Sequence, residues 1–168
     1  FTGGSENTMH MLQCGAAYTP AIMQGEYYRI FTSMFLHFGP QHLGNNMLVL
    51  FVLGGRLERT VGKLKYLLIY LLGGMGGNLL CLFLELDSAD FAGASGAVFA
   101  VMGAMIYAVI RGRGHIEDLS ARQVVIMAAF SLYFGFTSEG VDNAAHVGGL
   151  ICGFLLAVLL YHPSQRAG

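Results

Sequence analysis

Five long stretches of this 168-residue chain contain no Asp, Glu, Lys or Arg. A helix needs about 20 mostly apolar residues to cross a bilayer, with a range of about 17 to 25, so the stretches predict an all-α, polytopic membrane helix bundle. They cover residues 30–55, 66–84, 91–110, 123–138 and 143–165. The corresponding membrane spans are expected at 42–57, 64–86, 95–110, 122–138 and 143–161. The third and fourth spans are short, which suits helices that end beside a cavity.

The composition agrees with a single-domain membrane protein. Hydrophobic residues make up 55% of the chain and charged residues 11%, whereas soluble domains have about 25% charged residues. The 24 glycines fit as well, because small residues let membrane helices pack closely. The net charge of −1 offers no basic surface for nucleic acid. Cys14, Cys81 and Cys152 lie far apart and lack CxxC spacing, so no disulfide framework is expected.

The basic residues predict the orientation in the membrane. Eight of the nine lysines and arginines fall in the loops 56–65 and 111–122 or in the C-terminal tail, and only Arg29 falls on the opposite side. Cytoplasmic loops of membrane proteins carry an excess of Lys and Arg. The C-terminus is therefore expected in the cytoplasm, and the start of the chain and the loops 87–94 and 138–142 are expected outside.

We expect three regions along the chain. Residues 1–40 are interrupted by Pro and Gly, and they are interpreted as an extracytoplasmic, interfacial loop region with short helices near 9–17 and 27–36. Residues 41–162 are expected to form the transmembrane core, and residues 163–168 a cytoplasmic tail. Five spans with an external start imply a further helix upstream if the natural N-terminus is cytoplasmic.

This topology brings four polar side chains to a similar depth. His42, Ser95 and His146 each lie in the first turn or so of a helix that enters from the outer face. Asn46 follows His42 by four residues and therefore shares its helix face. Polar side chains inside membrane helices usually face the bundle interior or a water-filled cavity. Residues from three helices can thus converge on one site.

Ser95 is the candidate nucleophile of this site. A serine needs a base to become nucleophilic, and a histidine within hydrogen-bond reach can supply it. Gly93 and Gly96 flank Ser95 and permit a tight turn and the close approach of another chain. The alternative is that Ser95 serves only helix packing in a glycine-rich membrane protein.

His146 is the candidate base. It precedes Gly149-x-x-x-Gly153, a spacing of small residues that lets helices approach closely. The alternative is a histidine that is satisfied by a neighbouring carbonyl group. Asp142 lies four residues earlier, but it is expected to cap the helix at the interface rather than to complete a triad. The sequence therefore favours a Ser-His dyad.

Peptide hydrolysis also needs hydrogen-bond donors for the developing oxyanion. The side chains of His42 and Asn46 suit this role, and the backbone N–H of Ser95 is a third donor. The alternative is that Asn45 and Asn46 bridge helices. We expect no metal ion and no cofactor in this chemistry.

The stretch 123–138 is the shortest without charge. Ser131 and Gly135 interrupt its otherwise aromatic and aliphatic sequence, so this helix is interpreted as the weakest-packed wall of the site. It is the candidate lateral gate for a membrane substrate, with Phe134 and Phe136 as the side chains that would close it.

Together these segments resemble the rhomboid intramembrane serine proteases over essentially the whole chain. The matching segments are Tyr28-Arg29, His37-x4-His42-x3-Asn46, Gly55-Arg56-Leu57-Glu58-Arg59, Gly62, Gly93-Ala94-Ser95-Gly96 and Ala145-His146-x2-Gly149-x3-Gly153. The resemblance implies a serine endopeptidase that cuts transmembrane proteins near the outer membrane face. It implies Ser95 as nucleophile and His146 as general base and acid, within a multi-pass protein of a bacterial plasma membrane.

The resemblance also implies supporting residues. His42, Asn46 and the Ser95 N–H would stabilise the oxyanion. The remaining implied residues are Gly93, Gly96 and Phe99 around the active site, and Arg29, Glu58, Gly149 and Gly153 in structural roles. Three departures from the family pattern stand out: the first of six core helices is absent, Tyr28 replaces a Trp, and Phe99 replaces a Tyr. Phe99 can still stack on His146 but cannot donate a hydroxyl hydrogen bond.

Other functions fit the sequence less well. A non-catalytic rhomboid-like protein that binds membrane clients is expected to lack the serine or the histidine, and both are present. His37 and His42 suggest a metalloprotease, but the chain has no HExxH motif. A transporter would show inverted repeats or paired broken helices, and none is visible.

Overall fold

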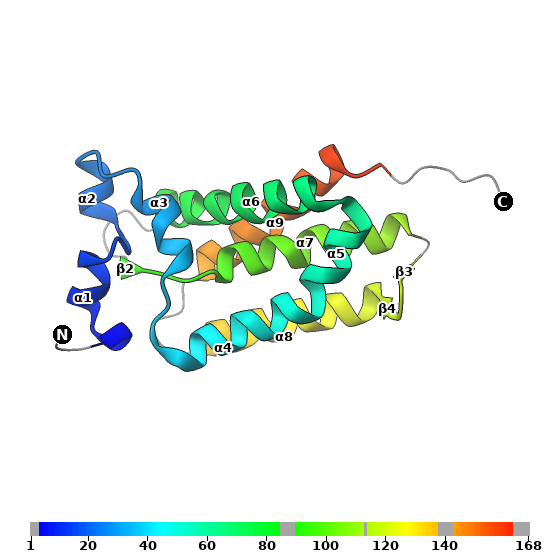
Figure 1. The fold of residues 1–168 in the computed structure, drawn as a ribbon, viewed down its shortest axis with the longest axis horizontal. Coiled ribbons are helices and arrows are strands. Elements are labelled where there is room, and N and C mark those ends of the chain that lie inside the picture. The colour runs from blue at the N-terminus through cyan, green and yellow to red at the C-terminus, as the bar shows by residue number, and fades with distance from the viewer. Residues whose placement is uncertain (1–3, 85–89, 113, 138–142, 163–168) are drawn as a thin grey trace.

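The computed structural model describes residues 4–84, 90–112, 114–137 and 143–162. Long helices run along the longest axis of the molecule, and short elements gather at both ends (Figure 1). The long elements are α4 (Gly39–Val49), the π-helical segment η3 (Leu50–Gly54), α5 (Gly55–Val61), α6 (Lys63–Leu84), α7 (Ser95–Arg111), α8 (Ala121–Thr137) and α9 (Asn143–Leu160).

The predicted all-α bundle is confirmed, and the long helices follow the predicted spans within a few residues. Among the residues that the structure describes, α6 and α9, with 22 and 18 residues, are the helices long and apolar enough to cross a membrane by length and composition. α7 and α8 are apolar but shorter, as expected for the third and fourth spans. The number of spans therefore stays a prediction.

Glycines set the spacing of α6, α7 and α9. A Cβ atom added at Gly74 of α6 would lie 2.8 Å from the Cβ of Ala97 on α7. One added at Gly148 of α9 would lie 3.0 Å from the Cα of Gly77 on α6. The helices are thus in contact through their backbones, as small residues permit in membrane bundles. α7 lies at the centre of this packing.

The N-terminal region contains short helices at one end of the bundle (Figure 1). Its elements are η1 (Gly4–Glu6), α1 (Thr8–Gln13), β1 (Ala17–Tyr18), α2 (Thr19–Met23), α3 (Arg29–Thr32) and η2 (Ser33–Phe35). The α3–η2 pair lies within the predicted segment 27–36, whereas α1 begins one residue before the predicted segment 9–17 and ends four residues earlier than predicted. α2 was not predicted; Pro20 lies in its first turn, where the missing N–H costs no helical hydrogen bond.

A short strand pairing ties this region to the approach to α7. β1 pairs in antiparallel fashion with β2 (Asp90–Phe91), with Ala17 opposite Phe91. β2 is followed almost directly by α7 (Figure 1). The N-terminal region is thereby attached to the segment that leads into Ser95.

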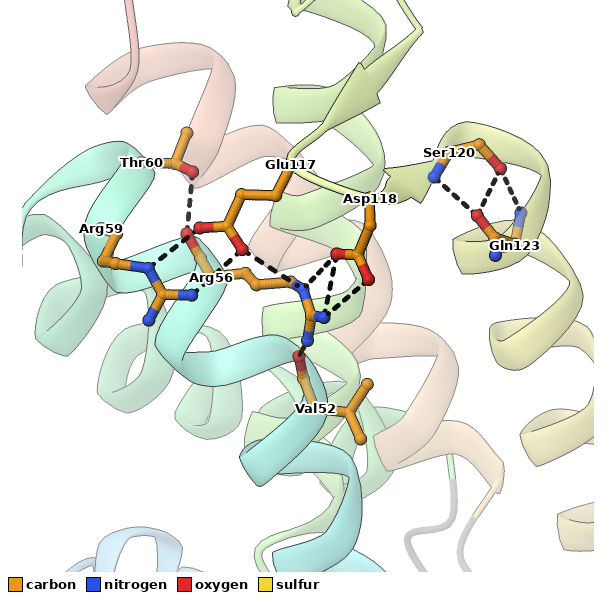
Figure 2. Close-up of polar contacts among 8 residues, drawn as sticks. All are labelled: Val52, Arg56, Arg59, Thr60, Glu117, Asp118, Ser120 and Gln123. Carbon is orange, nitrogen blue, oxygen red and sulfur yellow. Dashed lines mark hydrogen bonds and ion pairs between the residues drawn. The ribbon is translucent and has the colours of Figure 1, made fainter.

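The opposite end of the bundle is held by ion pairs between segments far apart in the sequence (Figure 2). β3 (His115–Ile116) and β4 (Leu119–Ser120) form a hairpin between α7 and α8. Arg56 on α5 binds both carboxylate oxygens of Asp118 in this hairpin, at 3.0 and 3.2 Å. Arg59 binds both carboxylate oxygens of Glu117, at 2.9 and 3.1 Å. α5 is therefore linked to the loop that begins α8.

Glu58 lies between these two arginines on α5. Among the described residues, its side chain makes no hydrogen bond or ion pair, and the arginines hold this end of the helix instead. The structural role expected of Glu58 therefore stays a prediction.

Candidate active site

Three helices contribute the predicted site residues to one cavity of about 350 Å³. Its lining includes His42 and Asn46 from α4, Ser95 and Phe99 from α7, and His146 from α9. Ser95 is the first residue of α7 and His146 the fourth residue of α9. The four polar side chains expected at one depth therefore surround the same space.

Ser95 and His42 approach a common point beside Gly93. A Cβ atom added at Gly93 would lie 3.1 Å from Nε2 of His42 and 3.4 Å from Oγ of Ser95. Gly93 also has a φ of +155°, which L side chains rarely adopt. Any side chain at this position would intrude between the serine hydroxyl and the imidazole, so the turn before α7 needs glycine.

The His146 ring is held by stacking. Its imidazole lies against the Phe99 ring, with the ring centroids 4.4 Å apart and the planes at 21°. Its side chain is buried, at 6% exposure. Nδ1 of His146 has no hydrogen-bond partner among the described residues. Aromatic packing rather than a carboxylate therefore orients this histidine in the described part of the chain.

Asn46 presents an unused donor to the cavity. The side chain is buried, yet its Nδ2 has no hydrogen-bond partner within the described residues. Leaving a buried donor unpaired costs about 1–3 kcal/mol, and such groups collect at sites that bind or react. Within the described residues Nδ2 of Asn46 therefore makes no hydrogen bond between helices, and the role of this residue stays a prediction.

The backbone at the start of α7 adds positive potential to the cavity. The first N–H groups of a helix lack partners within the helix, and the helix dipole favours negative charge at this end. Ser95 is the first residue of the 17-residue α7. The positive end of α7 and the Asn46 side chain therefore border the same cavity.

Close contacts between α7 and α9 bring the two halves of the site together. A Cβ atom added at Gly149 would lie 2.9 Å from the carbonyl carbon of Gly96. One added at Gly153 would overlap the backbone of Ala100. Gly149 and Gly153 thus lie where the helix of His146 crosses the helix of Ser95.

Arg29 holds the N-terminal region together. Its guanidinium donates hydrogen bonds of 2.8 Å to the backbone carbonyls of Leu12 and Ala16, and it pairs with Glu26 at 2.6 Å. Hydrogen bonds from Arg29 and then from Tyr28 keep the pKa of the Glu26 carboxyl below its ordinary value. Arg29 therefore joins α1 to α3, away from the cavity.

α8 forms the remaining wall of the cavity. Ser131, Phe134 and Gly135 of α8 line it, and so do Leu48 and Val49 of α4. Phe136 does not line the cavity, and its side chain is exposed. Of the two aromatic residues expected at a gate, Phe134 alone faces the site.

Asn78 and Ser33 were missed in the sequence. Nδ2 of Asn78, buried on α6, donates to the carbonyl of Ile30 at 2.8 Å and to Oγ of Ser33 at 3.1 Å. A lone amide in the charge-free stretch 66–84 was a visible signal, because polar groups inside membrane helices rarely lack a partner. Its partner Ser33, in the short helix η2 45 residues away, was not predictable from periodicity.

Two other expectations concern groups around the site. Within the described ranges, no three His, Cys, Asp or Glu side chains lie close enough together to hold a metal ion. Asp142, expected to cap the helix of His146, lies outside the described residues.

Comparisons with known proteins find relatives that all belong to one family. The family model of the Rhomboid domain matches residues 24–163. The chain is 37% identical to the rhomboid protease GluP of Bacillus subtilis over 165 residues, which are 98% of this chain and 32% of GluP. It is 33% identical to the rhomboid protease AarA of Providencia stuartii, over 89% of this chain and 61% of AarA. The chain thus spans about a third of the length of GluP.

Proposed function

This chain belongs to the rhomboid family of multi-pass integral membrane proteins, and from this premise we propose that it is an intramembrane serine endopeptidase. Its substrates would be transmembrane proteins, cut near the outer face of the membrane. The observation that carries the proposal is the cavity shared by Ser95, His146, His42 and Asn46. These side chains come from the three helices α4, α7 and α9.

The proposed reaction is acyl transfer through Ser95. His146 accepts the proton of the Ser95 hydroxyl while Oγ attacks the carbonyl carbon of the peptide bond. The tetrahedral oxyanion receives hydrogen bonds from Asn46, from His42 and from the N–H of Ser95. His146 then gives its proton to the leaving amine, and the peptide C–N bond breaks to leave an acyl ester on Ser95.

Water completes the cycle. His146 removes a proton from a water molecule that attacks the ester, and the second tetrahedral intermediate uses the same donors. Collapse of this intermediate releases the new carboxyl terminus and returns the proton to Ser95. Removing one oxyanion donor typically lowers the rate by about 10²–10³, so the side chains of α4 carry a large share of the proposed catalysis.

We further propose that substrates enter between α4 and α8. Both helices line the cavity, and α8 presents Phe134 to it. A transmembrane substrate must reach the site sideways from the lipid, and the less tightly packed wall is the one that can move. Phe134 would then act as the closing side chain of this entrance.

The proposed orientation places the cavity near the outer surface of a plasma membrane. α1, α2 and β2 lie at one end of the bundle, and α5 with the β3–β4 hairpin at the other (Figure 1). The loops rich in Lys and Arg belong to the second end, which is expected in the cytoplasm. A cysteine at exposed Met9, with native cysteines removed, should react with an impermeant maleimide in intact cells. Reaction only after lysis would reverse the orientation.

The proposed function is tested by cleavage of a single-span substrate in proteoliposomes. Ser95→Ala should abolish cleavage and leave the thermal unfolding midpoint unchanged. Ser5→Ala, an exposed serine in η1, is the matched control and should cleave at the normal rate. A protein that only binds membrane clients would retain the substrate without cutting it. Full cleavage by Ser95→Ala would refute the proposed nucleophile.

A further inference from the structure

We propose that His37 is a positioning residue for this reaction, because it holds both the turn that carries Ser95 and the side chain of His42. The inference rests on the proposed serine chemistry. His37 lies just before α4, outside the cavity lining, and its imidazole is half-buried. None of the roles assigned above uses it.

The turn before Ser95 is held from outside by one short segment of the N-terminal region. The N–H of Gly93 donates to the carbonyl of Ser33 at 2.9 Å. The N–H of Ala94 donates to Nε2 of His37 at 3.4 Å. Two successive backbone groups directly before Ser95 therefore bind residues 33–37.

This external hold matters because the turn has little rigidity of its own. Gly93 has no side chain and adopts a backbone conformation that few other residues reach. The direction of the Ser95 hydroxyl and of the Ser95 N–H depends on this turn. Ser33 is itself fixed by the buried Asn78 amide at 3.1 Å, so the segment that binds the turn is anchored to α6.

The same imidazole also contacts His42. The two rings meet edge to face, with centroids 5.4 Å apart and an interplanar angle of 71°. Nε2 of His42 and Oγ of Ser95 lie 3.1 and 3.4 Å from the point that a Cβ of Gly93 would occupy. One side chain thus limits the motion of two proposed contributors to the oxyanion site.

The hydrogen-bond partners of His37 require a neutral ring. Accepting from Ala94 leaves Nε2 without a proton, and the ring also hydrogen-bonds to the backbone of Phe35. Burial, followed by the nearby His42, lowers the pKa of His37 below its ordinary value. The acceptor form is therefore the stable form at neutral pH.

Two substitutions of His37 distinguish the effect of its hydrogen-bond acceptor from the effect of its aromatic ring. His37→Phe keeps an aromatic edge against His42 but cannot accept from Ala94. His37→Gln offers an amide oxygen to the Ala94 N–H but has no ring. His115→Phe changes an exposed histidine in β3, at the far end of the bundle, and serves as the matched control.

We expect His37→Phe to lower kcat by about tenfold to 10²-fold, as a displacement of reacting groups by about 1 Å does. KM should change by less than about twofold, since the substrate contacts are intact. His37→Gln should recover most of the lost kcat. His115→Phe should match the wild type in both constants. If His37→Phe does not fold, His37→Leu replaces it as the variant without an acceptor.

The measurements are kcat and KM on a transmembrane substrate, normalised to the folded fraction, together with Ser95→Ala. A normal kcat in the acceptor-free variant would overturn the inference, and so would equal losses in His37→Gln and His37→Phe. A loss explained entirely by a smaller folded fraction would make His37 merely structural. If Ser95→Ala cleaves normally, the proposed function itself fails, whatever His37 does.

Discussion

α7 and α8 have the same length and similar apolar sequences, but they are buried to very different degrees. α7 buries twelve of its 17 residues and packs between α6 and α9. α8 also has 17 residues and buries only Val124, Ala128 and Gly135. Small residues explain the difference, because Gly96 and Gly103 let α9 approach the α7 backbone, whereas α8 carries large aromatic side chains that remain exposed.

This contrast divides the site into a rigid and a looser part. Ser95 and His146 belong to the tightly packed helices. Asn46 belongs to α4, where only Gly39 and Asn46 itself are buried. Regions with few buried contacts open more easily than the core. The proposed nucleophile and base are thus held firmly, and the two proposed side-chain oxyanion donors and the proposed substrate entrance lie on the walls that can adjust.

The largest expected effect is on kcat, and it comes from a substitution on α4, in the looser part of the site. Asn46→Ala should lower kcat by about 10²–10³ and leave KM nearly unchanged, because an oxyanion contact exists only in the transition state. The unfolding free energy should fall little, since interhelical hydrogen bonds in membranes average about 0.6 kcal/mol. Steady-state kinetics and thermal unfolding of one preparation measure both. Lost stability with normal turnover would assign Asn46 to the bundle instead.

The next effect comes from the rigid part and concerns stability. Gly149→Ala adds a methyl group 2.9 Å from the carbonyl carbon of Gly96, which must push α9 away from α7. Such overpacking costs about 1–3 kcal/mol, and cleavage should fall as His146 moves from Ser95. Gly44→Ala on α4 is the control, because a Cβ there meets nothing within 4 Å. Equal denaturation curves for the two variants would contradict the packing account.

A smaller effect is expected at the entrance. Phe134→Ala opens the α8 wall of the cavity and should raise cleavage of a transmembrane substrate several-fold relative to that of a short soluble peptide. Phe136→Ala removes an exposed ring that does not line the cavity and should change neither rate. The ratio of the two cleavage rates is the measurement. An equal response to both substitutions would place the entrance elsewhere.

The smallest effect is expected at the ion pairs that link α5 to the β3–β4 hairpin. Hydrogen bonding to Arg59 lowers the pKa of the Glu117 carboxyl, so the charged form stabilises the fold at neutral pH. This contribution is complete above the ordinary pKa of a glutamate and is lost as the pH falls through the lower folded value. Glu117→Gln should therefore lower the unfolding midpoint slightly at neutral pH.

The matched measurement repeats the unfolding at acid pH. Below both pKa values the wild type and Glu117→Gln should unfold at the same temperature, because the wild-type carboxyl is then neutral as well. High salt should also reduce the difference, since exposed pairs are screened. A difference that persists unchanged in acid would show that Glu117 acts through packing rather than through charge.

The sequence predicted the long helices because the physics that defines them is local. The bounds of α6, α8 and α9 predicted from charge-free stretches and their flanking loops differ from the observed ones by at most two residues. Contacts between distant segments had no such signal. The pairing of β1 with β2, and of Arg56 with Asp118 some 62 residues later, depends on the finished fold.

The sequence predicted which residues form the candidate site, but it did not predict the distances between them. Helix direction and depth predicted that His42, Ser95 and His146 lie close together, and all three line one cavity. The stacking distance of 4.4 Å between Phe99 and His146 and the approach of Gly149 to Gly96 required coordinates. The sequence shows His37 five residues before His42. Its hydrogen bond with Ala94 was not predictable, because it joins segments 57 residues apart.

A fluorophosphonate probe can show whether Ser95 is a nucleophile that His146 activates. Attack by Oγ on phosphorus forms a covalent bond and releases fluoride, so the adduct records nucleophilic reactivity without any substrate. Mass mapping of the labelled, folded protein should find one adduct, on the peptide that contains Ser95. The adduct should be absent in Ser95→Ala and strongly reduced in His146→Ala. An unlabelled wild type, or the same labelling in Ser95→Ala, would contradict the account.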